Sequence, residues 1–239
     1  MIAGAPRDPL RVAVLQSNYI PWKGYFDLIN SVDLFVFYDD VQYTHRDWRN
    51  RNKIKTANGS IWLTVPVGDS SSRLINEVEI PDPGWQKKHW QTLRENYSKC
   101  PHFQRYQTFF ESIYLGVSWK SLSELNQTLI KHIAVEFLGS RTRFANSTEF
   151  GSSGQKMDRL LDLVRRTEAT SYLSGPAAKA YIEPERFAEN GIDLLWMDYS
   201  GYPEYPQRFP PFEHGVSILD LLFNAGPEAP DLIWGWRQR

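Results

Sequence analysis

Two short apolar runs flank an amphipathic segment in the first forty residues, and this arrangement constrains the fold more than any other feature. Residues 11–15 (RVAVL) and 34–38 (LFVFY) have the character of strands buried on both faces. Between them the apolar positions repeat at the spacing of one helix face: Tyr25, Leu28, Ile29 and Val32. The pattern predicts a strand-helix-strand unit whose two strands run parallel.

The remaining sequence extends this alternation after a helical interruption. Strand-like runs and helical periodicity follow one another at 61–67 (strand), 85–138 (helical), 142–145 (strand), 155–168 (helix), 171–174 (strand) and 193–199 (strand). Ser217 is a good N-cap for a last short helix that ends near Phe223. We therefore expect an α/β fold, a mostly parallel, Rossmann-like open sheet flanked by helices, with a helical insertion in the middle of the chain.

This organisation predicts one α/β domain over 1–239. Its expected parts are an N-terminal α/β part at about 10–68, a helical insertion at about 84–140 and a C-terminal α/β part at about 141–230.

The charge balance restricts the partners. Lys and Arg number 27 and Asp and Glu 28, a net charge of −1, which disfavours nucleic acid as a partner. No window approaches the roughly 18 apolar residues of a spanning helix and residues 1–10 lack a signal-peptide core, so we expect a cytoplasmic protein without membrane insertion. Cys100 is the one cysteine, so neither an internal disulfide nor a metal site is predicted.

Polar and basic residues gather where the first two strands end. Residues 44–55 (THRDWRNRNKIK) hold several cations against a single acid, Asp47, and Arg forks bind phosphate or carboxylate. Since open parallel sheets bind ligands at the carboxyl ends of their strands, we expect these side chains to bind an anionic small molecule. The candidates here are Gln16, Asn18, Tyr19, Trp22, Lys23, Gln42, Arg46, Arg51 and Lys53. A solvated charged loop is the alternative interpretation of the basic run, with single-stranded nucleic acid a weaker one.

Three side chains are candidate catalytic bases. Asp40 follows the second strand, His45 lies in the basic run and His214 stands beside Glu213. Because neighbouring strand residues point to opposite faces, at most one of Asp39 and Asp40 is expected in a given site.

The aromatic residues, 14% of the chain, divide into two groups. Those of the apolar runs are expected in the core: Phe35, Phe37, Tyr25 and Trp62. The proline-rich stretch 199–212, with Tyr199 and Tyr202, suits a stiff aromatic wall that recognises a sugar ring or a flat acyl group. Packing of that stretch onto the core is the other interpretation.

Several motifs carry a resemblance to a known family. The run LQSNYIPWKGYF, the element DDVQY and the later DYSGYPEYPQ and SILDLLFNAGPEAP resemble the WbqC-like protein family over Arg11 to Pro230. Where the family is expected to have LQP, this chain has Leu15-Gln16-Ser17, which leaves the turn less rigid. The resemblance points to these positions: Gln16, Tyr19, Pro21, Gly24, Tyr25, Asp40, Gln42, Arg46, Asn50, Arg51, Asn52, Lys53, Ser217, Asp220 and Asn224.

The resemblance implies a small cytosolic enzyme of O-antigen, other polysaccharide or natural-product biosynthesis. The activity it implies is transfer of an acyl, aminoacyl or glycyl group to an amine of a sugar nucleotide or related small molecule. The donor would be coenzyme A or the phosphopantetheine arm of an acyl or peptidyl carrier protein. The phosphates of the donor or of the acceptor would be held by Arg46, Arg51 and Lys53. The carbonyl of the acyl group would be oriented by Gln16, Asn18 and Gln42.

Two other functions stay open at this point. A strand, a polar turn and a helix also begin nucleotidylyl-transferring and adenylate-forming enzymes, although the His-x-x-His pair expected in the first turn is missing and neither a P-loop nor a G-x-G-x-x-G motif is present. A non-catalytic module that binds a sugar nucleotide or a carrier protein is the third hypothesis.

Overall fold

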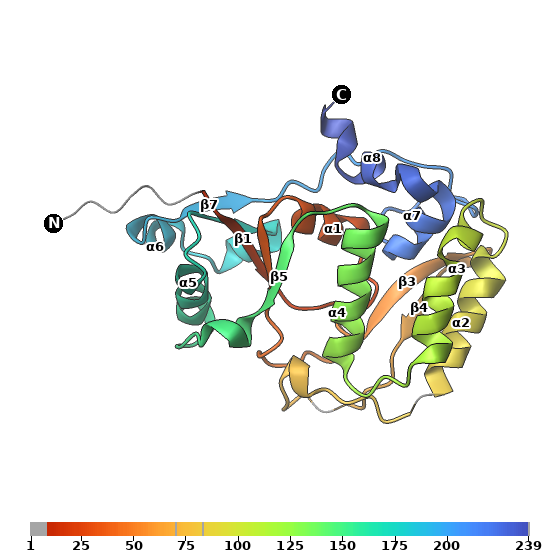
Figure 1. Cartoon of the computed structure of the whole chain (residues 1–239), viewed down its shortest axis with the longest axis horizontal. Helices are drawn as coiled ribbons and strands as arrows, with labels where there is room; N and C mark the ends of the chain where they lie inside the picture. Colours follow the sequence, from red (N-terminus) through yellow and green to blue (C-terminus); the bar gives the residue numbers. More distant parts are fainter. Residues whose placement is uncertain (1–8, 70, 83, 239) are drawn as a thin grey trace. The chain divides into compact units, whose positions relative to one another are not determined.

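The computed structural model describes residues 9–69, 71–82 and 84–238 (Figure 1). By its internal contacts this part of the chain divides into two compact units. The first unit comprises residues 9–15, 28–38 and 141–200; the second comprises 16–27, 39–140 and 201–238. The expectation of a single domain stays a prediction.

The first unit is built on a parallel sheet of five strands, as the sequence predicts. The strands are β1 (Arg11–Leu15), β2 (Leu34–Phe37), β5 (Arg143–Asn146), β6 (Ser171–Ser174) and β7 (Asp193–Trp196). They lie in the order β5-β2-β1-β6-β7, with Val12 opposite Leu34 and Arg11 opposite Ser171. In chain order this is the 3-2-1-4-5 arrangement of Rossmann-like sheets, whose direction of winding reverses between β1 and β6. The predicted fold class is confirmed.

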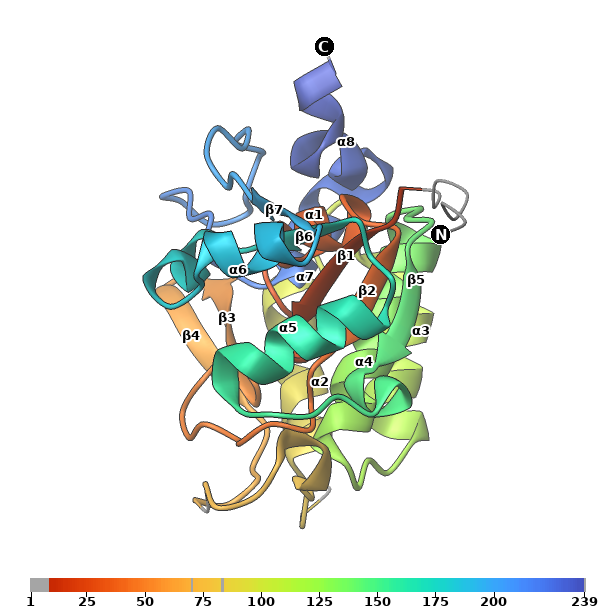
Figure 2. The same cartoon turned by 90° about the vertical axis from the view of Figure 1, so that its left-hand side faces the viewer.

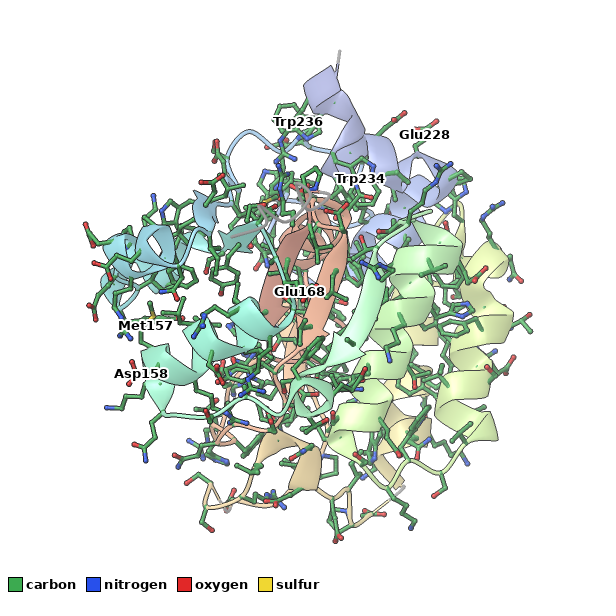
Figure 3. All side chains as sticks on the ribbon, turned by 60° about the vertical axis from the view of Figure 1, so that its left-hand side comes forward. Met157, Asp158, Glu168, Glu228, Trp234 and Trp236 are labelled. Carbon is green, nitrogen blue, oxygen red and sulfur yellow. The ribbon has the colours of Figure 1, made fainter. Side chains whose placement is uncertain are left out.

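Helices flank this sheet. The longest of them in the first unit is α5 (Lys156–Arg166), which lies across one face of the sheet next to β1 (Figure 2). Met157 and Asp158 mark its start and Glu168 lies just past its end (Figure 3). The shorter elements are η4 (Ser147–Phe150), η5 (Pro176–Ala180) and α6 (Pro184–Glu189). The core between α5 and the sheet is aliphatic, with Val12, Val36 and Leu163 buried.

The second unit contains an antiparallel hairpin that the sequence analysis did not predict. Strands β3 (Arg51–Thr56) and β4 (Gly59–Thr64) pair so that Lys53 faces Trp62. The strand expected over 61–67 therefore begins at Gly59, and the end of the basic run is a strand rather than a loop.

The predicted helical insertion is confirmed and belongs to the second unit. After the single turn η1 (Ile75–Glu77) come α2 (Gly84–Tyr97), α3 (Phe103–Glu111) and α4 (Leu122–His132). Helices α3 and α4 each run on into a π turn, η2 (Ser112–Gly116) and η3 (Ile133–Phe137). The rings of Phe109 and His132 stack with their centres 3.7 Å apart, which joins α3 to α4.

The last elements are α7 (Ile218–Ala225), η6 (Gly226–Glu228), α8 (Ala229–Ile233) and η7 (Gly235–Gln238). Ser217 caps α7 as predicted, since its hydroxyl accepts the Leu219 N–H at 3.3 Å. Trp234 and Trp236 lie near the end of this stretch (Figure 3). Helix α1 (Lys23–Asn30) begins in the second unit and ends in the first. Among the residues placed by the structure, no helix has both the length and the apolar character needed to cross a membrane.

Candidate active site

One face of the β3–β4 hairpin carries a row of cations. Because side chains alternate along a strand, Arg51, Lys53 and Lys55 share this face with Trp62. The Arg51 guanidinium carbon lies 4.3 Å from the centre of the Trp62 ring, and the Lys53 amine lies 5.5 Å from it. A cation over an indole keeps its positive charge available to an incoming anion, because the ring holds it without neutralising it.

Two indoles lie exposed beside these cations. The Trp48 and Trp62 rings are 5.3 Å apart and retain 44% and 41% exposure. Trp62 was expected in the core, and that expectation is wrong because β4 faces solvent at this position. We call Trp48, Trp62, Arg51 and Lys53 the hairpin face.

The proline-rich segment contacts the hairpin. Glu213 lies 3.7 Å from the Lys53 amine and accepts a hydrogen bond from the Ser60 hydroxyl. The buried Lys55 amine donates to the Pro211 carbonyl. Through these contacts the segment that carries the candidate base His214 is bound to the hairpin at Pro211 and Glu213.

His214 is exposed, and its ring lies 4.6 Å from that of Phe212. Partial desolvation, followed by the charge of Lys23, lowers the pKa of His214 below its usual 6.5. At neutral pH its imidazole is therefore mostly uncharged and able to accept a proton.

Lys23, at the start of α1, is almost completely buried. Its amine lies 5.0 Å from the Tyr202 ring, 5.4 Å from the Tyr205 ring and 5.7 Å from the Phe212 ring, and it donates to the Pro203 carbonyl at 3.5 Å. Burial lowers its pKa to about 8. The aromatic wall expected from the sequence thus encloses a lysine of this chain.

Asp220 on α7 supplies a buried carboxylate in the same part of the unit. Tyr205 and Tyr97 donate to its two oxygens at 2.9 and 3.0 Å, and burial raises its pKa. Its charge opposes the effect of burial on Lys23.

The polar turn after β1 is bound to the chain after β2, as the parallel strands predict. The Ser17 N–H donates to Asp39 at 2.8 Å, and Ser123 and Gln127 also donate to that buried carboxylate. Gln16 and Asn18 both accept hydrogen bonds from Arg49. These two candidate binding residues therefore hold an arginine of the basic run in place.

Tyr19 is completely buried, and its hydroxyl bridges two other side chains. It lies 2.9 Å from His89 Nδ1 and 2.6 Å from the Tyr114 hydroxyl. Burial lowers the pKa of His89 to about 4, so this imidazole is neutral and shares a hydrogen bond with the Tyr19 hydroxyl. The geometry gives Tyr19 a positioning role.

The remaining amide candidates also support the backbone. Asn52 donates to the Tyr19 and Ile20 carbonyls, and Asn50 donates to the Val65 carbonyl at 2.9 Å. Both side chains are buried, so they shape the turn that leads into the hairpin.

Trp22 and Tyr202 pack together, with an edge-to-face contact at 6.0 Å. The Tyr202 hydroxyl donates to buried Asp27 at 2.5 Å, and Arg237 pairs with the same carboxylate at 2.7 Å. A Cβ on Gly24 would lie 2.3 Å from the Trp22 ring, so only glycine fits there.

Other candidates lie away from these contacts. His45 pairs with Asp69 at 3.5 Å, exposed Gln42 donates to the Ser71 carbonyl, and the carbonyl of exposed Arg46 accepts from Arg51. Asp40 is half-buried. Tyr199 belongs to the first unit, where its hydroxyl lies 3.6 Å from the position of a Cβ on Gly175.

Sequence reasoning missed the pairing of Lys53 with Trp62. Asn58-Gly59 is a strong hairpin-turn signal, and Gly59 adopts the positive φ of +99° that favours glycine there. Recognition of a turn here would have paired the basic run with the next strand and placed Trp62 among the cations; in the structure the residues of the turn are Ala57 and Asn58, so Thr56 faces Gly59.

Other chemistries find less support in the described chain. Among residues 9–69, 71–82 and 84–238, no three His, Cys, Asp or Glu side chains gather as metal ligands. Burial raises the pKa of Cys100 to about 11, so its thiol is protonated at neutral pH.

Comparison with known proteins gives two matches. The model of the WbqC-like protein family matches residues 16–232. A protein of Mycobacterium tuberculosis (strain ATCC 25618 / H37Rv), named "Uncharacterized protein Rv1507c", is 47% identical over 230 residues, covering 95% of this chain and 99% of the relative. No solved structure matches the chain.

Proposed function

Since the chain belongs to the WbqC-like protein family, as its sequence motifs predict, we propose that it is a transferase of O-antigen or related biosynthesis. It moves an acyl or aminoacyl group, such as glycyl, to the amine of an anionic small molecule, a sugar nucleotide being the substrate class we favour. The observation that best supports this proposal is the hairpin face, where two cations and two exposed indoles lie beside the segment that contains Glu213 and His214.

The hairpin face suits a ligand with a phosphate and a flat ring. Arg51 presents a planar fork that matches phosphate oxygens, and Lys53 adds a second positive charge. Trp48 and Trp62 offer ring faces on which a base or a sugar stacks, and stacking on such a ring contributes about 1–3 kcal/mol per base.

The proposed reaction uses His214 as the base. The amine nitrogen attacks the acyl carbonyl carbon, the new C–N bond forms and the C–S or C–O bond to the donor breaks. His214 accepts the proton that the amine loses and returns it to the departing thiolate or alkoxide. The Lys23 ammonium beside it favours the neutral imidazole in the resting protein.

Binding is tested by titrating the protein with UDP and with coenzyme A while following tryptophan fluorescence. Arg51→Ala combined with Lys53→Ala should raise the dissociation constant of the bound probe by about tenfold or more, since charge-assisted hydrogen bonds contribute about 1.5–3 kcal/mol each. Lys88→Ala combined with Lys99→Ala removes the same charge from exposed positions. Equal losses in the two double variants would exclude a specific anion site on the hairpin.

Turnover is tested with acyl and aminoacyl thioesters and an amino sugar nucleotide. His214→Gln should lower kcat by about 10²–10⁴ and leave binding unchanged, because it removes a proton acceptor and no phosphate contact. An unchanged kcat would contradict the role of His214, and binding without turnover would favour the binding module.

The strand order of the first unit favours a second candidate function. Sheets of this order bind nucleotides beyond the carboxyl ends of their strands, which suits nucleotidylyl transfer or adenylate formation. Incubation with ATP, magnesium and candidate acids would release pyrophosphate in that case and leave ATP intact under the leading proposal.

A further inference from the structure

A cavity of about 540 Å³ lies on the second unit along α2 and η2. We call it the α2 cavity, and its lining includes Lys87, Trp90, Arg94 and Leu115. Its volume is within the range of about 300–1,000 Å³ that small-molecule sites occupy. None of its lining residues belongs to the hairpin face.

Two cations border the α2 cavity. Lys87 and Arg94 are seven positions apart on α2, which is about 10.5 Å along the axis and nearly two full turns, so they project to the same side. The one acid in the lining, Glu95, accepts a hydrogen bond from Gln91 at 2.9 Å. The lining therefore carries a net positive charge.

The floor of the cavity holds an unused hydrogen-bond donor. The Trp90 side chain is 3% exposed and stacks on Phe103 and Tyr114, with ring centres 5.9 and 6.3 Å away. Its indole N–H has no acceptor among the residues that the structure describes. Buried tryptophan N–H groups usually have a partner, and leaving one unpaired costs about 1–3 kcal/mol. Because the indole nitrogen itself is buried, a ligand in the cavity meets the Trp90 ring.

An exposed leucine forms the apolar side. Leu115 retains 52% exposure on the π turn η2, and π turns are frequent at functional sites. Buried Gln86 fixes the turn by donating to the Tyr114 and Val117 carbonyls at 3.2 and 2.6 Å. Because these two hydrogen bonds hold the backbone on either side of Leu115, its side chain is kept exposed at the surface.

From these four features we infer that the α2 cavity binds an amphipathic anion, a ligand with one anionic head and an apolar body. The apolar body lies against Leu115 and the Trp90 ring. The head lies between Lys87 and Arg94, whose positive charges hold it. This site is separate from the hairpin face and does not depend on the proposed transfer reaction.

The test is calorimetric titration of the full chain with four probes. Octanoate and octyl phosphate carry both parts of the ligand, octanol lacks the anionic head, and inorganic phosphate lacks the apolar body. Binding of either octyl anion, with octanol and phosphate at least about tenfold weaker, is the expected result, since the missing part removes a charge-assisted contact or buried apolar area. The stronger of the two anions identifies the head as carboxylate or phosphate. Failure of both anions to bind, or equal affinity for octanol, would overturn the inference.

Matched variants place the binding in the cavity. Arg94→Glu and Leu115→Asp should each weaken the bound anion by about tenfold or more, while Lys88→Glu and Val135→Asp should change its affinity by less than about twofold. Lys88 is an exposed cation of α2 outside the lining, and Val135 is an exposed apolar residue on the other π turn, η3. Equal effects of cavity and control variants would overturn the assignment.

Discussion

The two units bury different kinds of side chain. Among the described residues of the first unit, the buried polar side chains are neutral and small: Thr142, Ser147, Thr167 and Ser174. The second unit buries five charged ones: Lys23, Asp27, Asp39, Lys55 and Asp220. A buried charge is costly unless it is bound by partners, and each of these five has a hydrogen-bond partner within the second unit. The comparison places the buried charged side chains in the second unit and makes the first an apolar scaffold.

The largest effect is expected in the scaffold. Phe187 is completely buried in the first unit and stacks on Tyr172 at 5.3 Å. Phe187→Ala should lower the free energy of unfolding by about 3–5 kcal/mol through lost burial and the cavity left behind. Urea unfolding measures it, with Phe187→Leu as the volume-matched control that should cost less than about 1.5 kcal/mol. A strong pH dependence of this loss would contradict a scaffold stabilised by apolar packing.

Acid should act on the second unit through His89. Burial holds the pKa of His89 at about 4 in the folded chain, against 6.5 in the unfolded chain. Between pH 6.5 and pH 4 the unfolded chain therefore binds a proton at this residue that the folded chain does not bind. Stability therefore falls as pH drops from 6.5 to 4, by up to about 3 kcal/mol from this residue. His89→Gln should flatten that part of the unfolding profile.

Lys23 should produce a smaller effect on the alkaline side. Its folded pKa of about 8 lies below the ordinary 10.5, so above pH 8 the folded chain releases a proton that the unfolded chain retains. Stability then rises with pH, by about 1.5 kcal/mol between pH 8 and about 9.5, before tyrosines ionise in the unfolded chain. Lys23→Met should abolish the rise. An identical slope in the variant would show that another group carries it.

The smallest effect on stability is expected at a helix cap. Ser217→Ala should cost about 1 kcal/mol, because the hydroxyl that holds the start of α7 is lost. In the first unit, Gln155 precedes α5 without a side-chain cap bond, so Gln155→Ala should leave the melting temperature almost unchanged. A comparable loss at Gln155 would weaken the contrast between a polar second unit and an apolar first one.

The strands and helices of the first unit could be predicted from the sequence because the patterns that indicate them are local. The apolar runs at 11–15 and 34–38 and the spacing of the helix between them predict β1, α1 and β2 without knowledge of any distant partner. The parallel pairing follows from such repeated units and their crossover rule, whereas the strand order is known from the structure alone.

The candidate site depends on partners that are distant in sequence. Tyr19 is buried against His89 and Tyr114, which lie 70 and 95 residues further along the chain. The sequence around Tyr19 contains no signal that predicts these partners. Lys55 looks like one more cation of the basic run, yet it is buried against Pro211. From the sequence, the polar residues of this turn could therefore not be divided into exposed side chains and buried ones that support the backbone.

The chain passes between the two units five times, after residues 15, 27, 38, 140 and 200. During translation β1 and β2 are synthesised early. The second neighbour of β1 is β6, so Arg11 cannot pair until Ser171 has been synthesised. At about 5–20 residues per second the wait is on the order of ten seconds. During synthesis the nascent chain therefore exposes an unpaired apolar strand edge. Because both units are discontinuous in sequence, neither can be produced as one continuous fragment.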